Sequence, residues 1–157
     1  MTQTPMTGRR RIEMKAPTFD AFNVGDVHVT YGRTVTQTHL VNFTAMAGMQ
    51  LPLFINHQHA KEGPYGEPIA PGFLAASLSG GMMESVLGPN TLAGLGMDSF
   101  QFKTPVKVGD TLHAEIEIVS KKETKDAGRG VLGMRINVIN QRGESVLEYS
   151  AKVLMKR

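Results

Sequence analysis

The sequence of 157 residues contains neither cysteine nor tryptophan. Without cysteine, the chain cannot form disulfide bonds, thiolate zinc sites, iron–sulfur clusters or a cysteine nucleophile. The absence also fits the reducing cytoplasm, which is where we expect the protein. Aromatic residues make up only 6% of the chain, which argues against a protein that binds nucleic acids by stacking bases on aromatic rings.

Long apolar runs and a strong excess of one charge are absent as well. No run approaches the ~20 apolar residues that a membrane-spanning helix needs, and residues 1–15 lack the apolar core of a secretory signal. The 17 basic and 14 acidic residues give a net charge of +3, and the run Arg9–Arg11 accounts for this excess. We therefore predict a flexible basic arm over residues 1–20 and one folded domain over residues 21–157, with neither nucleic acid nor a membrane as partner.

The first half of the domain combines a strand, a helix and an irregular segment. Alternating β-formers after a turn predict a short strand over residues 27–31. Thr36 has the side chain of a helix N-cap and Gly48 is a natural stop, so we expect a helix between them. Residues 49–70 are rich in proline and glycine, and predict irregular structure with one helical turn capped by Asn56.

A long helix is predicted over residues 71–87, because Pro71 suits a first helical turn and apolar residues recur along the segment. Gly80 and Gly81 would each destabilise this helix by about 1 kcal/mol relative to alanine. We therefore expect a neighbouring sheet or a ligand to approach the helix closely at these glycines.

The remainder of the chain has the pattern of antiparallel strands. Apolar and polar residues alternate through the most regular segment, as in a sheet with one face exposed to solvent. Turn-forming pairs, Gly109–Asp110 and Arg142–Gly143, separate successive segments. The predicted strands are residues 97–105, 111–122, 130–140 and 145–156. Together with the earlier elements they predict an α+β domain, a five-stranded antiparallel sheet wrapped around one long helix.

Four segments carry a resemblance to a known family. They are residues 43–60 (FTAMAGMQLPLFINHQHA), 65–72 (YGEPIAPG), 75–80 (AASLSG) and 100–110 (FQFKTPVKVGD). Together they resemble the MaoC-like dehydratase family, which includes the (R)-specific enoyl-CoA hydratases. The resemblance implies a single hot-dog domain with a lyase activity on acyl-CoA thioesters in fatty acid metabolism. It also implies a homodimer whose acyl tunnel lies between protomers, and no cofactor, since CoA enters only as part of the substrate.

The catalytic motif of this family is degenerate here. Its pattern, approximately G-D-x-N-P-[LI]-H-x-D, matches residues 48–56, in which Met49 occupies the position of the Asp and Phe54 that of the His. Neither side chain can transfer a proton, although general acid–base assistance typically contributes about 10²–10⁴-fold to a rate. We expect a dry pocket floor and no standard hydration mechanism. The catalytic residue is unknown, and His57 is a possible substitute base.

Other positions of the binding site are kept. By resemblance, Gly72 would hold the thioester oxygen with its backbone N–H, which the positive end of a helix favours. Ser79 and Met82 would line the acyl pocket, while Gln50 can bind but not activate water. The remaining predicted substrate-binding positions are Pro71, which replaces a histidine, and Asn56, which replaces an acidic residue. No metal site is predicted, because His57 and His59 would point to nearly opposite sides of a helical turn.

Three functions remain open from the sequence, besides the possibility that this chain pairs with an intact paralogue that supplies the chemistry. The first is an enoyl-CoA hydratase or dehydratase whose acid–base group is displaced. The second is an inactive hot-dog protein that binds acyl-CoA or acts as a scaffold. The third is a hot-dog thioesterase, which would need a carboxylate near the start of the long helix, where Glu67 and Glu84 are the candidates. Fold alone does not decide among them, because function resides in the site.

Overall fold

The computed structural model describes residues 16–157, so most of the predicted basic arm lies outside the described residues. The first element is a 3-10 helix, η1 (Phe19–Ala21). Phe19 is 3% exposed, its ring packs over the backbone of Gly130, and the Lys121 ammonium lies 4.5 Å from the ring centroid. The packed part of the chain therefore begins before the predicted boundary at residue 21.

The predicted five-stranded antiparallel sheet is confirmed. Its strand order is β1-β4-β5-β6-β3, and a short β2 pairs with the first residues of β4. The elements in chain order after η1 are β1 (Val27–Val29), β2 (Arg33–Thr34), α1 (Gln37–Ala47), α2 (Pro52–Ile55), α3 (His57–Glu62), α4 (Gly72–Leu87), β3 (Thr91–Phe102), β4 (Thr111–Glu123), β5 (Arg129–Ile139) and β6 (Ser145–Lys156).

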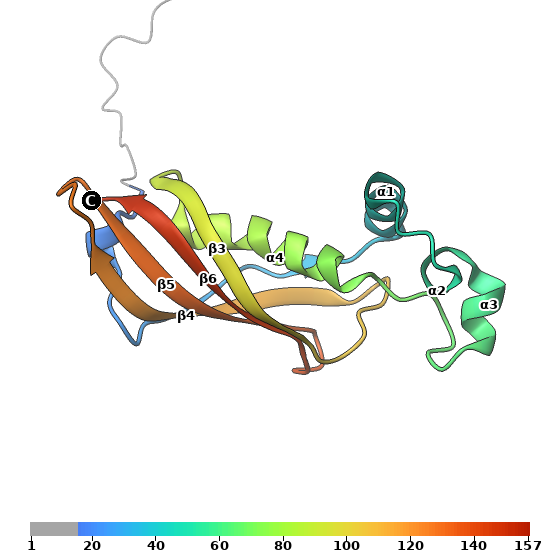
Figure 1. Ribbon diagram of the computed structural model, residues 1–157. Coiled ribbons are helices and arrows are strands. Elements are labelled where there is room, and N and C mark those ends of the chain that lie inside the picture. The colour runs from blue at the N-terminus through green and yellow to red at the C-terminus, as the bar shows by residue number, and fades with distance from the viewer. Residues whose placement is uncertain (1–15) are drawn as a thin grey trace, which may run out of the picture.

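The sheet curves around α4, which is the hot-dog architecture expected from the sequence (Figure 1). In β4 the inward residues Leu112, Ala114 and Ile116 are each 0% exposed, and the intervening residues face the other side of the sheet. Helix α4 buries apolar residues on its sheet-facing side, among them Leu74 and Met82. The core thus lies between one helix and the inner face of the sheet.

Of the two neighbours expected at the paired glycines of α4, a sheet or a ligand, the sheet does not approach them closely. A Cβ at Gly80 would meet nothing within 4 Å, and one at Gly81 would meet only the Arg33 guanidinium, at 3.8 Å. Both glycines lie on the side of α4 that the sheet does not cover. The tight glycine positions are elsewhere, at Gly72 and Gly130.

Helices α1, α2 and α3 lie together beyond one end of the sheet, far from the C-terminus (Figure 1). Helix α1 has the predicted ends: Thr36 and His39 form a capping box, and Gly48 ends the helix in the left-handed region at φ 66°. Asn56 caps α3 as predicted, because its Oδ1 accepts from the N–H of His59 at 3.0 Å. The segment is less irregular than expected, since Pro52 opens the additional helix α2.

Strand β3 differs from its predicted range. It begins at Thr91 rather than residue 97, and ends at Phe102. Its pairing with β6 has three register irregularities, and its other edge has no partner strand among the described residues. The glycine-containing start of β3 lacks the clean alternation that identifies a strand from sequence.

No helix within residues 16–157 is long and apolar enough to cross a membrane.

Candidate functional site

A cavity of about 330 Å³ opens where α4 begins. This volume is at the small end of the roughly 300–1,000 Å³ typical of small-molecule sites. The cavity, here called the Gly72 cavity, is mostly apolar. Its walls come from α2, from the segment leading into α4, from α4 itself, and from the end of β3 with the residues after it. The lining residues are Leu53, Phe54, Tyr65, Ile69, Ala70, Gly72, Ala75, Phe102, Lys103, Thr104, Pro105, Val106 and Val146.

Gly72 lies in this cavity as the first residue of α4, directly after Pro71 at the N-cap position. The first turn of a helix has backbone N–H groups without intrahelical acceptors, and its positive dipole end favours a developing oxyanion. Pro71 has no N–H to offer and is buried. A Cβ at Gly72 would lie 2.4 Å from Cε1 of Phe102, so any larger residue would displace that ring.

Phe54 separates the Gly72 cavity from a second one. It lines both the Gly72 cavity and a neighbouring cavity of about 240 Å³ between α1 and α2. A half-buried phenyl ring therefore occupies the wall where the family motif has its His. Met49 is also half-buried but lines neither of these two cavities.

The predicted polar residues near the motif are on the far side of Phe54. Gln50 and His57 line the second cavity together with Thr44, and they do not line the Gly72 cavity. Asn56 caps α3 and lines neither of the two. The structure thus brings Gly72 and Phe54 together, but it does not bring His57 or Gln50 to Gly72.

Ser79 and Met82 lie deeper along α4 and are both 0% exposed. The Ser79 hydroxyl donates to the carbonyl of Ala76 at 2.8 Å and lies 2.9 Å from the hydroxyl of Tyr149. Burial raises the pKa of Tyr149, and the hydrogen bond with Ser79 partly opposes that shift. Neither Ser79 nor Met82 lines the Gly72 cavity of this protomer. Sequence reasoning missed Tyr149, which only its inward position on β6 could have indicated.

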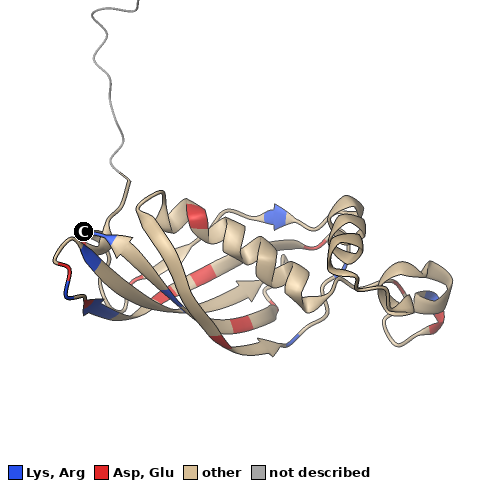
Figure 2. Ribbon diagram, turned by 45° about the horizontal axis from the view of Figure 1, so that its top comes forward, with Lys and Arg blue, Asp and Glu red and all other residues tan. Residues whose placement is uncertain are grey.

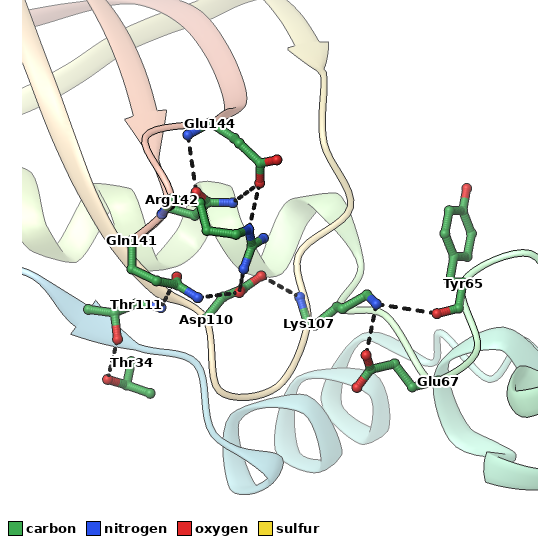
Figure 3. A network of polar contacts seen from close by, with 10 residues as sticks. Thr34, Tyr65, Glu67, Lys107, Asp110, Thr111, Gln141, Arg142 and Glu144 are labelled. Atoms are coloured by element: carbon green, nitrogen blue, oxygen red, sulfur yellow. Dashed lines mark hydrogen bonds and ion pairs between the residues drawn. The ribbon is translucent and has the colours of Figure 1, made fainter.

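The two carboxylates considered for a thioesterase are placed differently. Glu67 forms an ion pair with the Lys107 ammonium at 2.8 Å. The same ammonium donates a hydrogen bond to the carbonyl of Tyr65 at 3.3 Å (Figure 3). Glu84 lies in the last turns of α4, where it lines a separate groove. Neither carboxylate lines the Gly72 cavity.

A polar network fixes the wall segment that contains Lys107 (Figure 3). Buried Asp110 accepts from Arg142 at 2.8 Å, from Gln141 at 2.9 Å and from the N–H of Lys107 at 3.0 Å. Burial acts to raise the pKa of Asp110, but these hydrogen bonds and the Arg142 charge outweigh it and hold the pKa below its usual value. The network ties the β3–β4 connection to the β5–β6 turn, and through Lys107 to the segment before α4.

Residues 16–157 contain no group of three or more His, Asp or Glu side chains placed to hold a metal ion.

Comparison with known proteins identifies the family. The model of the MaoC like domain matches residues 22–138, so the chain belongs to the MaoC-like domain family. It is similar to Protein MaoC of Klebsiella aerogenes, at 28% identity over 106 residues that cover 68% of this chain and 31% of that protein. The (R)-specific enoyl-CoA hydratase of Aeromonas caviae is 35% identical over 83 residues, 53% of this chain and 61% of the hydratase.

Solved structures agree with the fold. The monoamine oxidase regulatory protein of Archaeoglobus fulgidus superposes with a TM-score of 0.80 at 31% identity, over 90% of this chain and 95% of that one. The chain spans less than a third of Protein MaoC and less than two thirds of the Aeromonas caviae hydratase. The predicted family and hot-dog fold are therefore confirmed, and enoyl-CoA hydratases are among the homologues.

Proposed function

We propose that this protein binds an acyl-CoA thioester in the Gly72 cavity and that the family's usual hydration step is absent from it. The thioester oxygen would accept from the backbone N–H of Gly72 at the start of α4, where the helix favours negative charge. The relationship to enoyl-CoA hydratases supports the substrate class. The observation that carries the proposal is that Gly72 and Phe54 line the same cavity.

The chemistry of the cavity wall explains the missing step. Hydration of an enoyl thioester needs a base that takes a proton from water and an acid that protonates the α-carbon. Phe54 and Leu53 present carbon atoms to the cavity, and an apolar surface offers water too few hydrogen-bond partners to hold it. The oxygen-binding part of the site is kept, whereas the water-handling part is apolar.

The test combines binding with turnover on one substrate, crotonyl-CoA. We expect saturable binding by isothermal titration calorimetry and no hydration above the uncatalysed rate, followed by the absorbance of the enoyl thioester. Gly72→Ala should weaken binding, because the new Cβ would force Phe102 to move. Ser77→Ala, an exposed change one turn further along α4, is the matched control. Absence of any binding, or hydration at rates typical of enzymes, would overturn the proposal.

A displaced catalytic base is the second candidate function. His57 and Gln50 line the cavity adjoining the Gly72 cavity, on the other side of Phe54. Hydration through His57 would require the Phe54 ring to swing aside. In that case His57→Ala should abolish the hydration of crotonyl-CoA while leaving its binding unchanged.

We further propose that the protein is a cytoplasmic homodimer formed along β3. This strand has an unpaired edge, no proline and Asp98 as its one charged residue, although exposed edges are normally protected. Figure 2 shows how little charge α4 and β3 carry compared with the other long strands of the sheet. Leu95 and Met97 are more than half exposed, and a second copy would cover them together with Gly80. Light scattering should give twice the protomer mass, and Leu95→Lys should halve it. A wild type that is monomeric at micromolar concentration would contradict the proposal.

A further inference from the structure

The space between α4 and β3, here called the seam, has a cavity near each end, and residues of both elements line both cavities. The Gly72 cavity lies where α4 begins and β3 ends. A larger groove of about 650 Å³ lies at the opposite end and is lined by Gly80, Met83, Leu87, Leu92 and Met97, among others. The residues of α4 between Ala75 and Gly80 line neither space.

Three aromatic rings join the first turn of α4 to the end of β3. Phe73 of α4 meets Phe102 of β3 edge to face at 5.7 Å, and it lies 6.3 Å from Phe100. Phe100 and Phe102 stack at 6.3 Å. Phe100 also stacks on Tyr149 at 4.9 Å, which fixes it to the core. The three rings, here called the aromatic barrier, therefore join helix to strand.

An irregularity in β3 turns two of these rings toward α4. Asp98 pairs with Ser150 and Gln101 with Glu148, so two residues of β3 face the single residue Tyr149. Such a bulge reverses the alternation of side chains beyond it. Before the bulge Met97 pairs with buried Ala151, and after it Phe102 pairs with buried Leu147. A regular strand would place Phe102 on the opposite face from Met97.

The bulge holds a strained residue. Ser99 has φ 59°, and it is the one residue other than glycine with positive φ among those described. A left-handed conformation costs a residue with a Cβ roughly 1–2 kcal/mol. Strain of this kind tends to persist where it places a functional group. Its visible result here is that the Phe102 ring lies against the backbone of Gly72.

We infer that Phe102 is a specificity-determining residue that restricts the site to short acyl chains. The inference rests on the proposed function, because it assumes a thioester whose carbonyl lies at Gly72. Phe102 lines the Gly72 cavity, so an acyl chain that lies in this cavity meets its ring. Without the Phe102 ring, the cavity would continue along the seam into the larger groove, whose lining is mainly apolar.

The experiment compares two saturated thioesters that cannot be hydrated, butyryl-CoA and octanoyl-CoA, by isothermal titration calorimetry. Wild type should bind butyryl-CoA about tenfold more tightly than octanoyl-CoA, the size of effect that a few methylenes have in a fitted pocket. Phe102→Ala should shift that ratio by about tenfold toward octanoyl-CoA, and Phe102→Leu should shift it less. Gln101→Ala, on the same strand but facing away from α4, should leave it unchanged.

The outcomes separate the inference from the function on which it rests. If wild type binds neither thioester, the proposed function fails and this inference with it. If wild type binds both equally well, or if both Phe102 variants keep the wild-type ratio, thioester binding stands and the inference is overturned. Thermal melting of each variant checks its fold, and Phe102→Leu keeps an apolar side chain if Phe102→Ala does not fold.

Discussion

Strands β4 and β3 have nearly equal lengths, 13 and 12 residues, but opposite character. Strand β4 lies inside the sheet between partners, and from Leu112 to Ile118 every second residue is buried. Strand β3 is an edge strand with three register irregularities, and it is exposed for almost its whole length. The regular strand carries the core, whereas the irregular strand shapes the site with Phe102. In this fold the regular strand β4 therefore contributes to stability, whereas the irregular strand β3 contributes to the shape of the cavity.

The largest effect on stability should come from the regular strand. Ile116→Ala removes a side chain that is 0% exposed, and should lower the free energy of unfolding by about 3 kcal/mol. Gln101→Ala on β3, where the side chain is exposed and lies outside the proposed dimer contact, should cost less than about 1 kcal/mol. Urea unfolding at neutral pH measures both. Equal losses would show that β3 is as well covered in solution as β4.

The next largest effect should come from the network that anchors the turns. Asp110→Asn leaves the Arg142 guanidinium without its buried partner and should cost about 2 kcal/mol at neutral pH. The hydrogen bonds and the Arg142 charge hold the pKa of Asp110 below its usual value, so its contribution is present above that usual value and is lost as the pH falls through the lowered pKa. The difference between wild type and variant should therefore disappear in acid.

Glu117→Gln is the control for Asp110. Its partner Arg135 lies 3.0 Å away, but the Arg135 side chain is 67% and the Glu117 side chain 39% exposed, and pairs in contact with solvent contribute little. A loss at Glu117 as large as that at Asp110 would mean that burial does not decide the strength of these ion pairs.

A smaller effect is expected at the bulge of β3. Ser99→Val places a β-branched residue at φ 59°, which should cost about 1–2 kcal/mol. Ser99→Gly tolerates the same backbone and should stay within about 0.5 kcal/mol of wild type, measured by the same unfolding curves. If valine is tolerated as well as glycine, the bulge is not held as the structure shows it.

The smallest change in stability is expected at the degenerate motif, where the effect on activity is larger. Met49→Asp combined with Phe54→His changes two half-buried side chains and should shift stability by about 1 kcal/mol or less. Phe54→His places an imidazole in the wall of the Gly72 cavity, so, if the thioester binds as proposed, hydration of crotonyl-CoA should rise about 10²-fold above the rate of wild type. Phe54→Leu is the control that removes the ring without adding a proton donor. A double variant that binds crotonyl-CoA but does not hydrate it would show that the cavity lacks room for water.

The sequence predicts best where local chemistry decides. The ends of α1 follow from Thr36 and Gly48, because a cap and a left-handed stop act within a few residues. The regular strands follow from their alternation. The predicted range of strand β3, residues 97–105, differs from the observed range of residues 91–102. Its glycines hide the alternation of apolar and polar residues, and its bulge reverses that alternation.

The site was predictable in composition but not in arrangement. Met49 and Phe54 show from the sequence alone that the standard acid–base pair is missing. That His57 lies behind Phe54 and that Phe102 covers Gly72 depends on how distant segments pack, which no local pattern encodes. The pairing of Ser79 with Tyr149 joins residues 70 positions apart, so it emerges only from the fold.

The buried hydroxyl of Tyr149 gives the protein an optical reporter for the contact between α4 and β6. The chain has three tyrosines and no tryptophan, and the other two, Tyr31 and Tyr65, are exposed. Because burial raises the pKa of Tyr149, the unfolded chain loses this proton first, and stability should fall as the pH rises above about 10. An alkaline titration followed by phenolate absorbance should therefore show Tyr149 losing its proton as the helix separates from the sheet.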